Sequence, residues 1–401
     1  MDEPIGQSHN GVGVESLLPR MKDDGYDAER VARRRQWLER QTGAALRHIG
    51  GASFDTELMR GNIENPIGVA QIPLGIAGPV MICGERAQGL FYVPMATTEG
   101  ALIRSYERGM MALSKAGGVK TALLADENHT APVLFFADVS EAAAFCRWIP
   151  EHLAELQAAA SETTRHGRLN GLECHQSGRQ VMLSLRFSTG DAQGMNMIVK
   201  ATQAVCRWIE RSYPIVSYYL FSGMCAEKRP AAILITRGKG KRVTAGALLP
   251  HSVLKMYLHA SAADLHRVWQ STVIGHLHAG AIGYNAHAAN GLAAIFIATG
   301  QDVANVVNSA CVVTSFEAVE AGLYASITIP ALSVATVGGG TGLPGQREAL
   351  EIMDCYGDGK AAKFAEIVAA TLLGGEISMG AAIASGEFVA AHERYGRNRP
   401  K

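Results

Sequence analysis

The sequence lacks the excess of charge that would mark a nucleic-acid-binding or membrane-surface protein. Its 37 Lys and Arg residues equal its 37 Asp and Glu residues, so the formal net charge is zero. No bulk attraction to a phosphate backbone or an anionic membrane is expected. Charged residues make up only 18% of the 401 residues, and apolar residues make up 48%. This balance excludes a disordered chain and leaves room for two or three domains.

Disulfide, membrane and export signals are also lacking. The seven cysteines are odd in number and form no CxxC pair, which indicates a reducing compartment without a disulfide framework. No uninterrupted apolar run reaches the roughly 18 to 20 residues that a membrane helix needs. The first residues, MDEPIGQSHN, are polar and acidic, unlike a signal peptide. We therefore expect a cytoplasmic protein that has neither a membrane segment nor a nucleic-acid partner.

Three charged residues do stand in segments where charge is costly. Glu99 interrupts the small-residue run ATTEGAL, Lys228 lies in CAEKRPAA, and Asp302 closes NAHAANGLAAIFIATGQD. A charge in apolar surroundings is stable only when it is paired, so two acids and one base predict a mutually compensating, chemically active site. Taken singly, each has a plainer interpretation, because Glu99 and Asp302 also fit helix caps and Lys228 fits a surface loop.

The middle of the chain, residues 131–221, has the pattern of a small separate module. The predicted elements are a strand at PVLFFA, a helix over 140–160 capped by Ser140, strands over 171–175 and 180–187, a helix over 192–211 and a strand at IVSYYLF. This β-α-β-β-α-β order predicts a ferredoxin-like module.

The remaining segments predict a larger domain around that module, and an α+β fold class. Residues 64–130 and 231–401 are rich in glycine and alanine and are expected to form one largely helical domain. Residues 222–230 are the loop that carries Lys228, and the AAILIT run after it is typical of a strand. Residues 1–63 form a separate N-terminal segment, whose charged helix from Asp27 to about His48 is interpreted as a surface helix rather than a docking helix.

Two segments are candidates for binding phosphates. The turn Gly338-Gly339-Gly340 lets backbone N–H groups approach a ligand, although a plain tight turn fits equally well. The overlapping GTGLPG matches GxGxxG but lacks a βαβ context, which disfavours a Rossmann site. The segment DAQGMNM from Asp191 opens a predicted helix, where a phosphate or sugar fits the unpaired N–H groups. An ordinary cap at Asp191 is the alternative.

The histidines do not predict a metal site. His276, His278 and His287 cluster in GHLHAGAIGYNAH, but no cysteine or carboxylate completes a ligand set at suitable spacing. His392 lies in the basic C-terminal segment AAHERYGRNRP. It is either a solvated residue or a proton donor that a closing flap delivers.

Several long stretches, in this order, resemble hydroxymethylglutaryl-CoA reductase, its class I form more closely than class II. The stretches are ENPIGVAQIPLGIAGPV (64–80), VPMATTEGALIRSYERG (93–109), DAQGMNM (191–197), EKRPAA (227–232), GYNAHAANGLAAIFIATGQD (283–302), ATVGGGTGLPGQ (335–346) and the tail with His392. The resemblance implies that NADPH reduces an acyl-CoA thioester to the alcohol. In that family the substrate is 3-hydroxy-3-methylglutaryl-CoA, the products are mevalonate and CoA, and the sites form between the subunits of a homodimer or higher homo-oligomer.

The resemblance also implies roles for individual residues. Glu99, Lys228 and Asp302 would form a hydrogen-bonded group around the thioester carbonyl, in which Lys228 stabilises the oxyanion. Glu99 would protonate the aldehyde-level intermediate, and His392 the departing CoA thiolate. The residues implied to bind the dinucleotide are Arg165, Asp191, Gly194, Met195, Asn196, Gly338, Gly339 and Gly340. Those implied to contact CoA and the acyl group are Ser105, Arg108, Glu227, Arg229, His287 and Asn290.

Two departures from the family pattern concern the acyl group. Ser271 stands where the family has a lysine that pairs with the substrate's free carboxylate, and Thr130 stands where it has an arginine. Retained thioester reduction with altered acyl recognition is therefore a hypothesis beside the authentic reaction. In that hypothesis the acyl group is carried either by CoA or by a carrier protein. A catalytically idle acyl-CoA-binding homologue is a further alternative. A plain α/β dehydrogenase is disfavoured for want of a βαβ unit.

Overall fold

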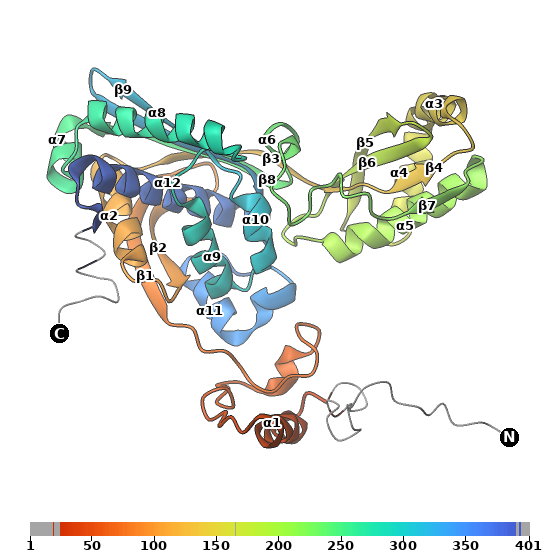
Figure 1. Ribbon diagram of the computed structural model, residues 1–401, viewed down its shortest axis with the longest axis horizontal. Coiled ribbons are helices and arrows are strands. Elements are labelled where there is room, and N and C mark those ends of the chain that lie inside the picture. Colours follow the sequence, from red (N-terminus) through yellow and green to blue (C-terminus); the bar gives the residue numbers. More distant parts are fainter. Residues whose placement is uncertain (1–18, 20–24, 165, 390–392, 394–401) are drawn as a thin grey trace. The chain divides into compact units, whose positions relative to one another are not determined.

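The computed structural model describes residues 19, 25–164, 166–389 and 393 (Figure 1). The predicted site residues Arg165 and His392 lie outside the described residues. The chain divides into two compact units, Met1–Pro73 and Leu74–Lys401. In the first unit the described elements are helix α1 (Ala28–Thr42) and the short helix η3 (Thr56–Met59).

Helix α1 confirms the predicted charged helix but is shorter. It ends at Thr42 because Gly43 takes a left-handed conformation and its N–H donates to the carbonyl of Glu39. The Arg34 guanidinium is buried and donates to the carbonyl oxygens of Gly25 and Pro66. One of the charges that suggested a surface helix, that of Arg34, is therefore buried and hydrogen-bonded within the first unit.

The second unit begins with a large part whose elements come from both sides of the inserted module. Before the module lie β1 (Leu74–Cys83), β2 (Gln88–Ala96), α2 (Leu102–Lys115) and β3 (Lys120–Thr130). After it lie α6 (Ile233–Arg237), β8 (Gly240–Pro250), α7 (His251–Val253), η5 (Leu254–Leu258), α8 (Ala262–Ala279), α9 (Ala288–Thr299), η6 (Val303–Asn305), α10 (Val306–Ser309), β9 (Val313–Val319), β10 (Gly322–Leu332), η7 (Gly339–Gly342), α11 (Pro344–Ile352) and α12 (Ala361–Ser385).

The module contains four strands and two main helical regions. Its elements are β4 (Val133–Phe135), α3 (Val139–Trp148), η4 (Ile149–His152), α4 (Leu153–Ser161), β5 (Arg168–Ser177), β6 (Gln180–Ser188), α5 (Met195–Ser212) and β7 (Ser217–Tyr219). The strands lie in the order β7-β4-β6-β5, and each neighbouring pair is antiparallel. The module has a hydrophobic cluster of its own, which includes Phe136, Phe145 and Phe187.

One continuous sheet joins the module to the large part. Strand β3 pairs with β8 over Lys120–Glu127 and then with β6 over Asn128–Thr130. Strand β4 continues along β6 without a change of register. The full order is β7-β4-β6-β3-β8-β10-β9, with β5 on the other edge of β6. A mixed fold with antiparallel sheets results. The flanking segments are rich in helix, as predicted, but they also supply strands that the prediction left out.

Four local predictions are corrected by tertiary context. The AAILIT segment is not a strand but supplies helix α6, whose Leu234 packs into a small buried cluster and whose end is closed by Gly238. The helix predicted over 140–160 is interrupted in the η4 turn around Pro150, which lacks an N–H, and its cap is Asp138, not Ser140. The last strand of the module is only Ser217–Tyr219.

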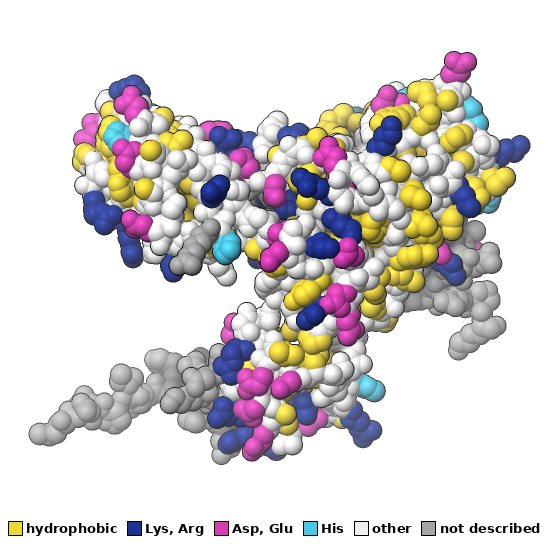
Figure 2. Space-filling model, turned by 180° about the vertical axis from the view of Figure 1, so that it is seen from behind, with side chains coloured by type: hydrophobic (Ala, Val, Ile, Leu, Met, Phe, Trp, Pro, Cys, Tyr) yellow, Lys and Arg dark blue, Asp and Glu magenta, His cyan; other side chains and the backbone are white. Residues whose placement is uncertain are grey.

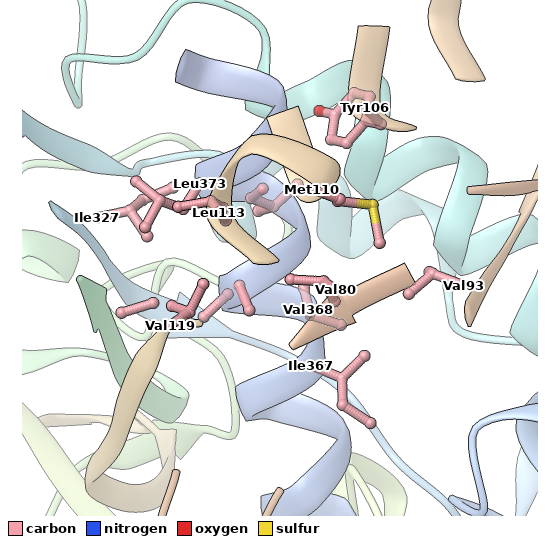
Figure 3. Close-up of a cluster of buried hydrophobic side chains, with 14 of the residues drawn as sticks. Val80, Val93, Tyr106, Met110, Leu113, Val119, Ile327, Ile367, Val368 and Leu373 are labelled. Atoms are coloured by element: carbon pink, nitrogen blue, oxygen red, sulfur yellow. The ribbon is translucent and has the colours of Figure 1, made fainter. Parts of the chain in front are cut away.

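The core of the large part is organised around α12. This helix contacts α2, α8, α9, β8 and β10, and Figure 1 shows it running through the large part beside them. Figure 3 shows its Val368 and Leu373 in one buried cluster with Val80, Met110 and Leu113. Close packing of such side chains is the main source of stabilisation for an element of this kind.

Helix α12 is long and apolar enough to cross a membrane by length and composition alone. Its best 18-residue window has a mean hydropathy of 1.7, yet 83% of that window is buried inside the structure. A helix that is hydrophobic all round is expected in the core of a large globular protein. The burial of α12 shows that the rest of the protein covers this helix.

Two buried glutamates of α12 hold distant loops by their backbone. One Glu366 carboxylate oxygen accepts hydrogen bonds from the N–H groups of Arg86 and Ala87, in the turn between β1 and β2. The Glu376 carboxylate accepts from the N–H groups of Ala286 and His287, just before α9. Burial raises the pKa of Glu376, and the two N–H donors oppose that shift by stabilising the ionised form.

The close crossing of α2 and α12 can be tested by adding a side chain at Gly109. A Cβ at Gly109 would overlap the backbone carbonyl of Gly374, which cannot move without distorting α12. We expect Gly109→Ala to lower the free energy of unfolding by about 3 kcal/mol, at the upper end of overpacking costs. Urea unfolding followed by circular dichroism measures this change.

The matched control is Gly275→Ala in α8, where a Cβ would meet open space. It should leave stability unchanged or raise it by up to about 1 kcal/mol, because alanine has the higher helix propensity. Equal stability of both variants would contradict the close helix crossing.

Candidate active site

The structure brings together two of the three charged residues that the sequence singled out. Lys228 Nζ lies 2.6 Å from Asp302 Oδ2. The other oxygen, Asp302 Oδ1, accepts the N–H of Ala304 and caps the turn that follows. Pairing and capping, predicted as alternatives for Asp302, thus both occur.

The ion pair is not buried, contrary to the expectation of charges in apolar surroundings. The Lys228 and Asp302 side chains are 44% and 39% exposed within this chain. An exposed pair of this kind contributes at most about 1 kcal/mol to stability. Folding stability is therefore a poor reason for the arrangement, and a chemical role explains it better.

Asp302 is held by a segment on its other side. The Gln301 side-chain amide binds both the N–H and the carbonyl of Ala335, at 2.7 and 3.0 Å. A Cβ at Gly340 would lie 2.7 Å from the carbonyl oxygen of Gly300, so only glycine lets the two backbones meet. The glycine turn that was predicted to bind the cofactor therefore lies beside Asp302.

Lys228 is presented by a loop with an uncommon backbone. Ala226 and Lys228 have φ angles of 52° and 55°, the left-handed region that side chains with a Cβ rarely adopt. The residue between them, Glu227, has a side chain only 15% exposed. Strained backbone of this kind persists only where surrounding contacts determine it, and it is enriched at functional sites.

Glu99 does not reach the other two charges within one chain. Its carboxylate lies 3.5 Å from Asn290 Nδ2, near the start of α9, whereas Asp302 follows the end of α9. Gly300 is ten residues beyond Asn290, which corresponds to about 15 Å along a helix axis. Glu99 is also no cap of α2, because Ala101 takes that position without a side-chain hydrogen bond.

The residues implied to contact CoA cluster along α12. Ser105 Oγ lies 3.3 Å from Ser378 Oγ, and the Arg108 guanidinium donates to Ser378 Oγ and O and to Glu387. Burial lowers the pKa of Arg108. His287 is buried, and its Nε2 lies 2.8 Å from the carbonyl oxygen of Gly375.

The two segments implied to bind the dinucleotide are also joined. The N–H of Thr336, just before the glycine turn, donates to the carbonyl of Asp191 at 2.9 Å. Asp191 is not the cap of α5, since Gly194 occupies that position in a left-handed conformation. The Asp191 carboxylate instead accepts the N–H groups of Gly359 and Ala361, at the start of α12.

The remaining predicted residues lie around these groups. Met195 and Asn196 open α5, and Asn196 is exposed. The Arg229 guanidinium donates to the carbonyl of Glu227 and lies over the Phe221 ring. A Cβ at Gly338 or at Gly339 would meet open space.

Three residues that matter for this geometry were missed by the sequence reasoning. They are Gln301, which ties the backbone beside Asp302 to Ala335, Glu376, which accepts the N–H of His287, and Ser378, which accepts from Arg108. Glu376 stands alone in the apolar run LLGGEISMG, the same signal that identified Asp302. Gln301 and Ser378 carry no comparable signal. Among the residues that the structure describes, no group of three His, Cys, Asp or Glu side chains is placed to hold a metal ion.

Comparisons with known proteins agree on one family. The family model of hydroxymethylglutaryl-coenzyme A reductase matches residues 30–397. The chain is 45% identical to the 3-hydroxy-3-methylglutaryl-coenzyme A reductase of Pyrococcus horikoshii over 374 residues, which cover 91% of each chain. It is 38% identical to 3-hydroxy-3-methylglutaryl-coenzyme A reductase 1 of Hevea brasiliensis over 387 residues, which cover 93% of this chain and 67% of that one.

A solved structure shares the fold at lower identity. The class II 3-hydroxy-3-methylglutaryl-CoA reductase of Streptococcus pneumoniae, bound to NADPH in open conformations, matches with a TM-score of 0.67 and 18% identity. The match covers 88% of this chain and 97% of that one. The overall architecture described above is therefore that of a known fold.

A buried histidine beside the site predicts a pH dependence of stability. His129, at the end of β3, is only 6% exposed, and burial together with the charges of Lys239, Arg186 and Arg237 lowers its pKa from 6.5 to about 4. Below pH 6.5 the unfolded chain binds a proton that the folded chain rejects. The free energy of unfolding should therefore fall by about 3 kcal/mol as the pH drops from 6.5 to 4.

Unfolding by urea at several pH values measures this, with His129→Leu as the non-titrating comparison. The wild-type value should fall relative to the variant over that window and stay parallel to it above pH 7. Parallel curves throughout would show that His129 does not supply the effect.

Proposed function

Because the chain belongs to the hydroxymethylglutaryl-coenzyme A reductase family, we propose that it reduces 3-hydroxy-3-methylglutaryl-CoA to mevalonate and CoA with NADPH. One thioester, two NADPH and two protons give the alcohol, free CoA and two NADP⁺. The observation that carries the proposal is the Lys228–Asp302 pair at 2.6 Å, exposed beside the glycine turn.

Lys228 is the group that stabilises the negative charge that develops on the thioester oxygen. When bound, NADPH supplies hydride, and charge then develops on the thioester oxygen. An ammonium held in place by Asp302 stabilises that oxygen without reorganisation, which is the largest catalytic effect available to such a site. Glu99 donates the proton to the aldehyde-level carbonyl, and His392 protonates the CoA thiolate.

The segments proposed to hold NADPH suit a dinucleotide. Helix α5 has 18 residues and no side-chain cap at its start, so its first N–H groups are available to a phosphate. Gly338 and Gly339 have positive φ and open space around them, which supports close approach of a flat ring to the backbone. Arg165 completes the proposed set.

We further propose that the inserted module is ferredoxin-like and comprises residues 131–221. Its strand order, its antiparallel neighbours and its separate hydrophobic cluster support this assignment. The large domain, 64–130 and 231–401, then binds CoA, residues 222–230 carry the catalytic lysine, and residues 1–63 form a separate N-terminal segment. The cytoplasm remains the proposed location, on the sequence grounds given above.

A homo-oligomer with sites between subunits is part of the proposal. Glu99 and the Lys228–Asp302 pair lie at opposite ends of α9, so a second copy is the natural source of the missing partner. Figure 2 shows hydrophobic side chains gathered on one face of the large part. Exposed apolar residues include Leu248, Met256, Ile274, Leu277 and Tyr324. Patches of this kind mark protein interfaces.

A second candidate is reduction of a thioester whose acyl group lacks the free carboxylate. Thr130 is buried, and its hydroxyl lies 2.6 Å from that of Thr202, so it offers no cation. Ser271 is exposed on α8. Neither position supplies the charge that would bind a carboxylate.

The reaction itself is tested by NADPH oxidation coupled to release of the CoA thiol. Wild type should consume two NADPH for each CoA released, and Lys228→Ala should lower kcat by about 100- to 1,000-fold, as loss of an oxyanion-stabilising group does. Lys255→Ala, an exposed lysine of η5, is the control and should retain full activity. Tight binding of the acyl-CoA without any NADPH oxidation would instead indicate the idle homologue.

The acyl group is tested by comparing 3-hydroxy-3-methylglutaryl-CoA with acyl-CoAs that lack the carboxylate. If recognition of the carboxylate is weakened, Ser271→Lys should lower KM for the authentic substrate about tenfold, because it adds one charge-assisted contact. KM for the neutral acyl-CoAs should not change. A wild-type enzyme with low KM for the authentic substrate and clear preference for it would remove the second candidate.

A further inference from the structure

We propose that Lys239 is a positioning residue for Lys228, because its buried ammonium holds Glu227 and thereby fixes the loop that presents Lys228 to Asp302. The inference rests on the proposed thioester reduction for its kinetic consequences. The effect of Lys239 on the conformation of residues 222–230 does not depend on that reaction and is tested separately.

The backbone of Lys239 is held closely against the core sheet. It stands between Gly238 and Gly240, which have φ angles of 74° and 71°. A Cβ at Gly238 would lie 2.7 Å from the carbonyl oxygen of Pro330, and one at Gly240 would lie 2.6 Å from that of Leu332. Both glycines are therefore required for the chain to pass this close to β10. The Lys239 backbone has little freedom to move.

The Lys239 ammonium is fully buried and contacts two segments, the loop that carries Glu227 and the end of β3. Its Nζ lies 2.8 Å from Glu227 Oε2, 2.9 Å from Asn128 Oδ1 and 3.1 Å from the carbonyl oxygen of His129. The Lys239 side chain is 0% exposed, and that of Glu227 is 15% exposed. Removal of either charge would leave the other desolvated and unpaired, which proteins rarely tolerate without rearrangement.

The ion pair acts on the residue that determines the loop. Glu227 is flanked by Ala226 and Lys228, both in the left-handed region. At its start the loop is tied to Ala131, whose carbonyl accepts the Ser222 N–H, whereas the backbone hydrogen bonds that flank Glu227 are short-range, from the Ala226 N–H to Gly223 and from the Arg229 N–H to Ala226. The Lys239 contact is therefore the charged link that ties Glu227, between the two strained residues, to the core sheet. Without it, the strained turn has no reason to keep Lys228 directed at Asp302.

The same ammonium also touches the segment proposed to hold the dinucleotide. Met195 Sδ lies 3.8 Å from Lys239 Nζ, and Gln193 Nε2 donates to the other oxygen of Glu227 at 3.4 Å. Asn128 Nδ2 donates to the carbonyl of Gln193. Lys239 thus sets the lysine loop and the start of α5 relative to one another.

Lys239→Met tests the proposal, since methionine keeps the length of the side chain and removes its charge. We expect kcat to fall about 100-fold, as for a catalytic group displaced by about 1 Å, and the fall should exceed any rise in KM. Lys239→Arg should recover at least a tenth of the wild-type kcat. In hydrogen–deuterium exchange of the unliganded protein, the peptide over 222–230 should exchange faster in Lys239→Met than in wild type.

A double-mutant cycle separates positioning from general destabilisation. In a Glu227→Gln background, adding Lys239→Met should lower kcat by less than about threefold, because the route through Glu227 is already gone. The matched control is Lys241→Met, a buried lysine two residues along that pairs with Asp126 at 2.8 Å. It should lower the melting temperature to a similar degree, with kcat within about threefold of wild type and unchanged exchange over 222–230.

Equal losses of kcat in both backgrounds, or unchanged exchange over 222–230, would overturn the proposal. Should Lys239→Met not fold, Lys239→Gln replaces it under the same criteria. A wild-type protein that oxidises no NADPH would defeat the proposed function instead, and the exchange experiment would still decide the role of Lys239.

Discussion

The burial of α12 is the constraint on which the rest of the second unit depends. An apolar helix of 25 residues must be covered on all sides, and the covering elements come from both sides of the inserted module. Contact at the closest point is possible because Gly109 and Gly374 carry no side chains where α2 crosses. Glu366 and Glu376 add polar specificity, since each buried carboxylate accepts backbone N–H groups from one particular loop that lies against the helix. Hydrophobic burial supplies the stability, and these two carboxylates determine which loops occupy the surface.

The candidate binding segments are arranged along this same helix. Asp191 accepts the N–H of Ala361 at its first residue, Glu376 holds the backbone of His287, and Ser378 holds Arg108. Ala361 and Ser378 are 17 residues apart, which corresponds to about 25 Å of helix. The proposed cofactor side and the proposed CoA side are thus separated by a fixed rod. Two long ligands that meet at one reacting carbon need a scaffold of that kind, and a rigid element positions a site better than loops do.

The sequence predicted the parts of this structure that depend on local pattern or on long family-like segments. The β-α-β-β-α-β order of the module and the pairing of Lys228 with Asp302 were both found as expected. The failures have a common physical cause, which is that distant contacts override local preference. AAILIT has the composition of a strand, but Leu234 is needed in a buried cluster and Gly238 ends the segment as a helix. Asp191 is a residue type that often caps the helix that follows it. Its carboxylate instead accepts the N–H of Ala361, the first residue of α12, more than 150 residues later. Pattern alone cannot reveal a partner at that distance.

Glu99 and the Lys228–Asp302 pair lie at opposite ends of α9. Asn290, which Glu99 contacts, and Asp302, which Lys228 contacts, are separated by the length of α9. That helix is buried along most of its residues and packs on β2, α11 and α12, so it cannot bend to bring its two ends together. This separation is the structural basis for the proposal that Glu99 and Lys228 of one reacting site come from different copies of the chain. The exposure of the Lys228–Asp302 pair then has a physical reason, because the surface that covers it would belong to the second copy.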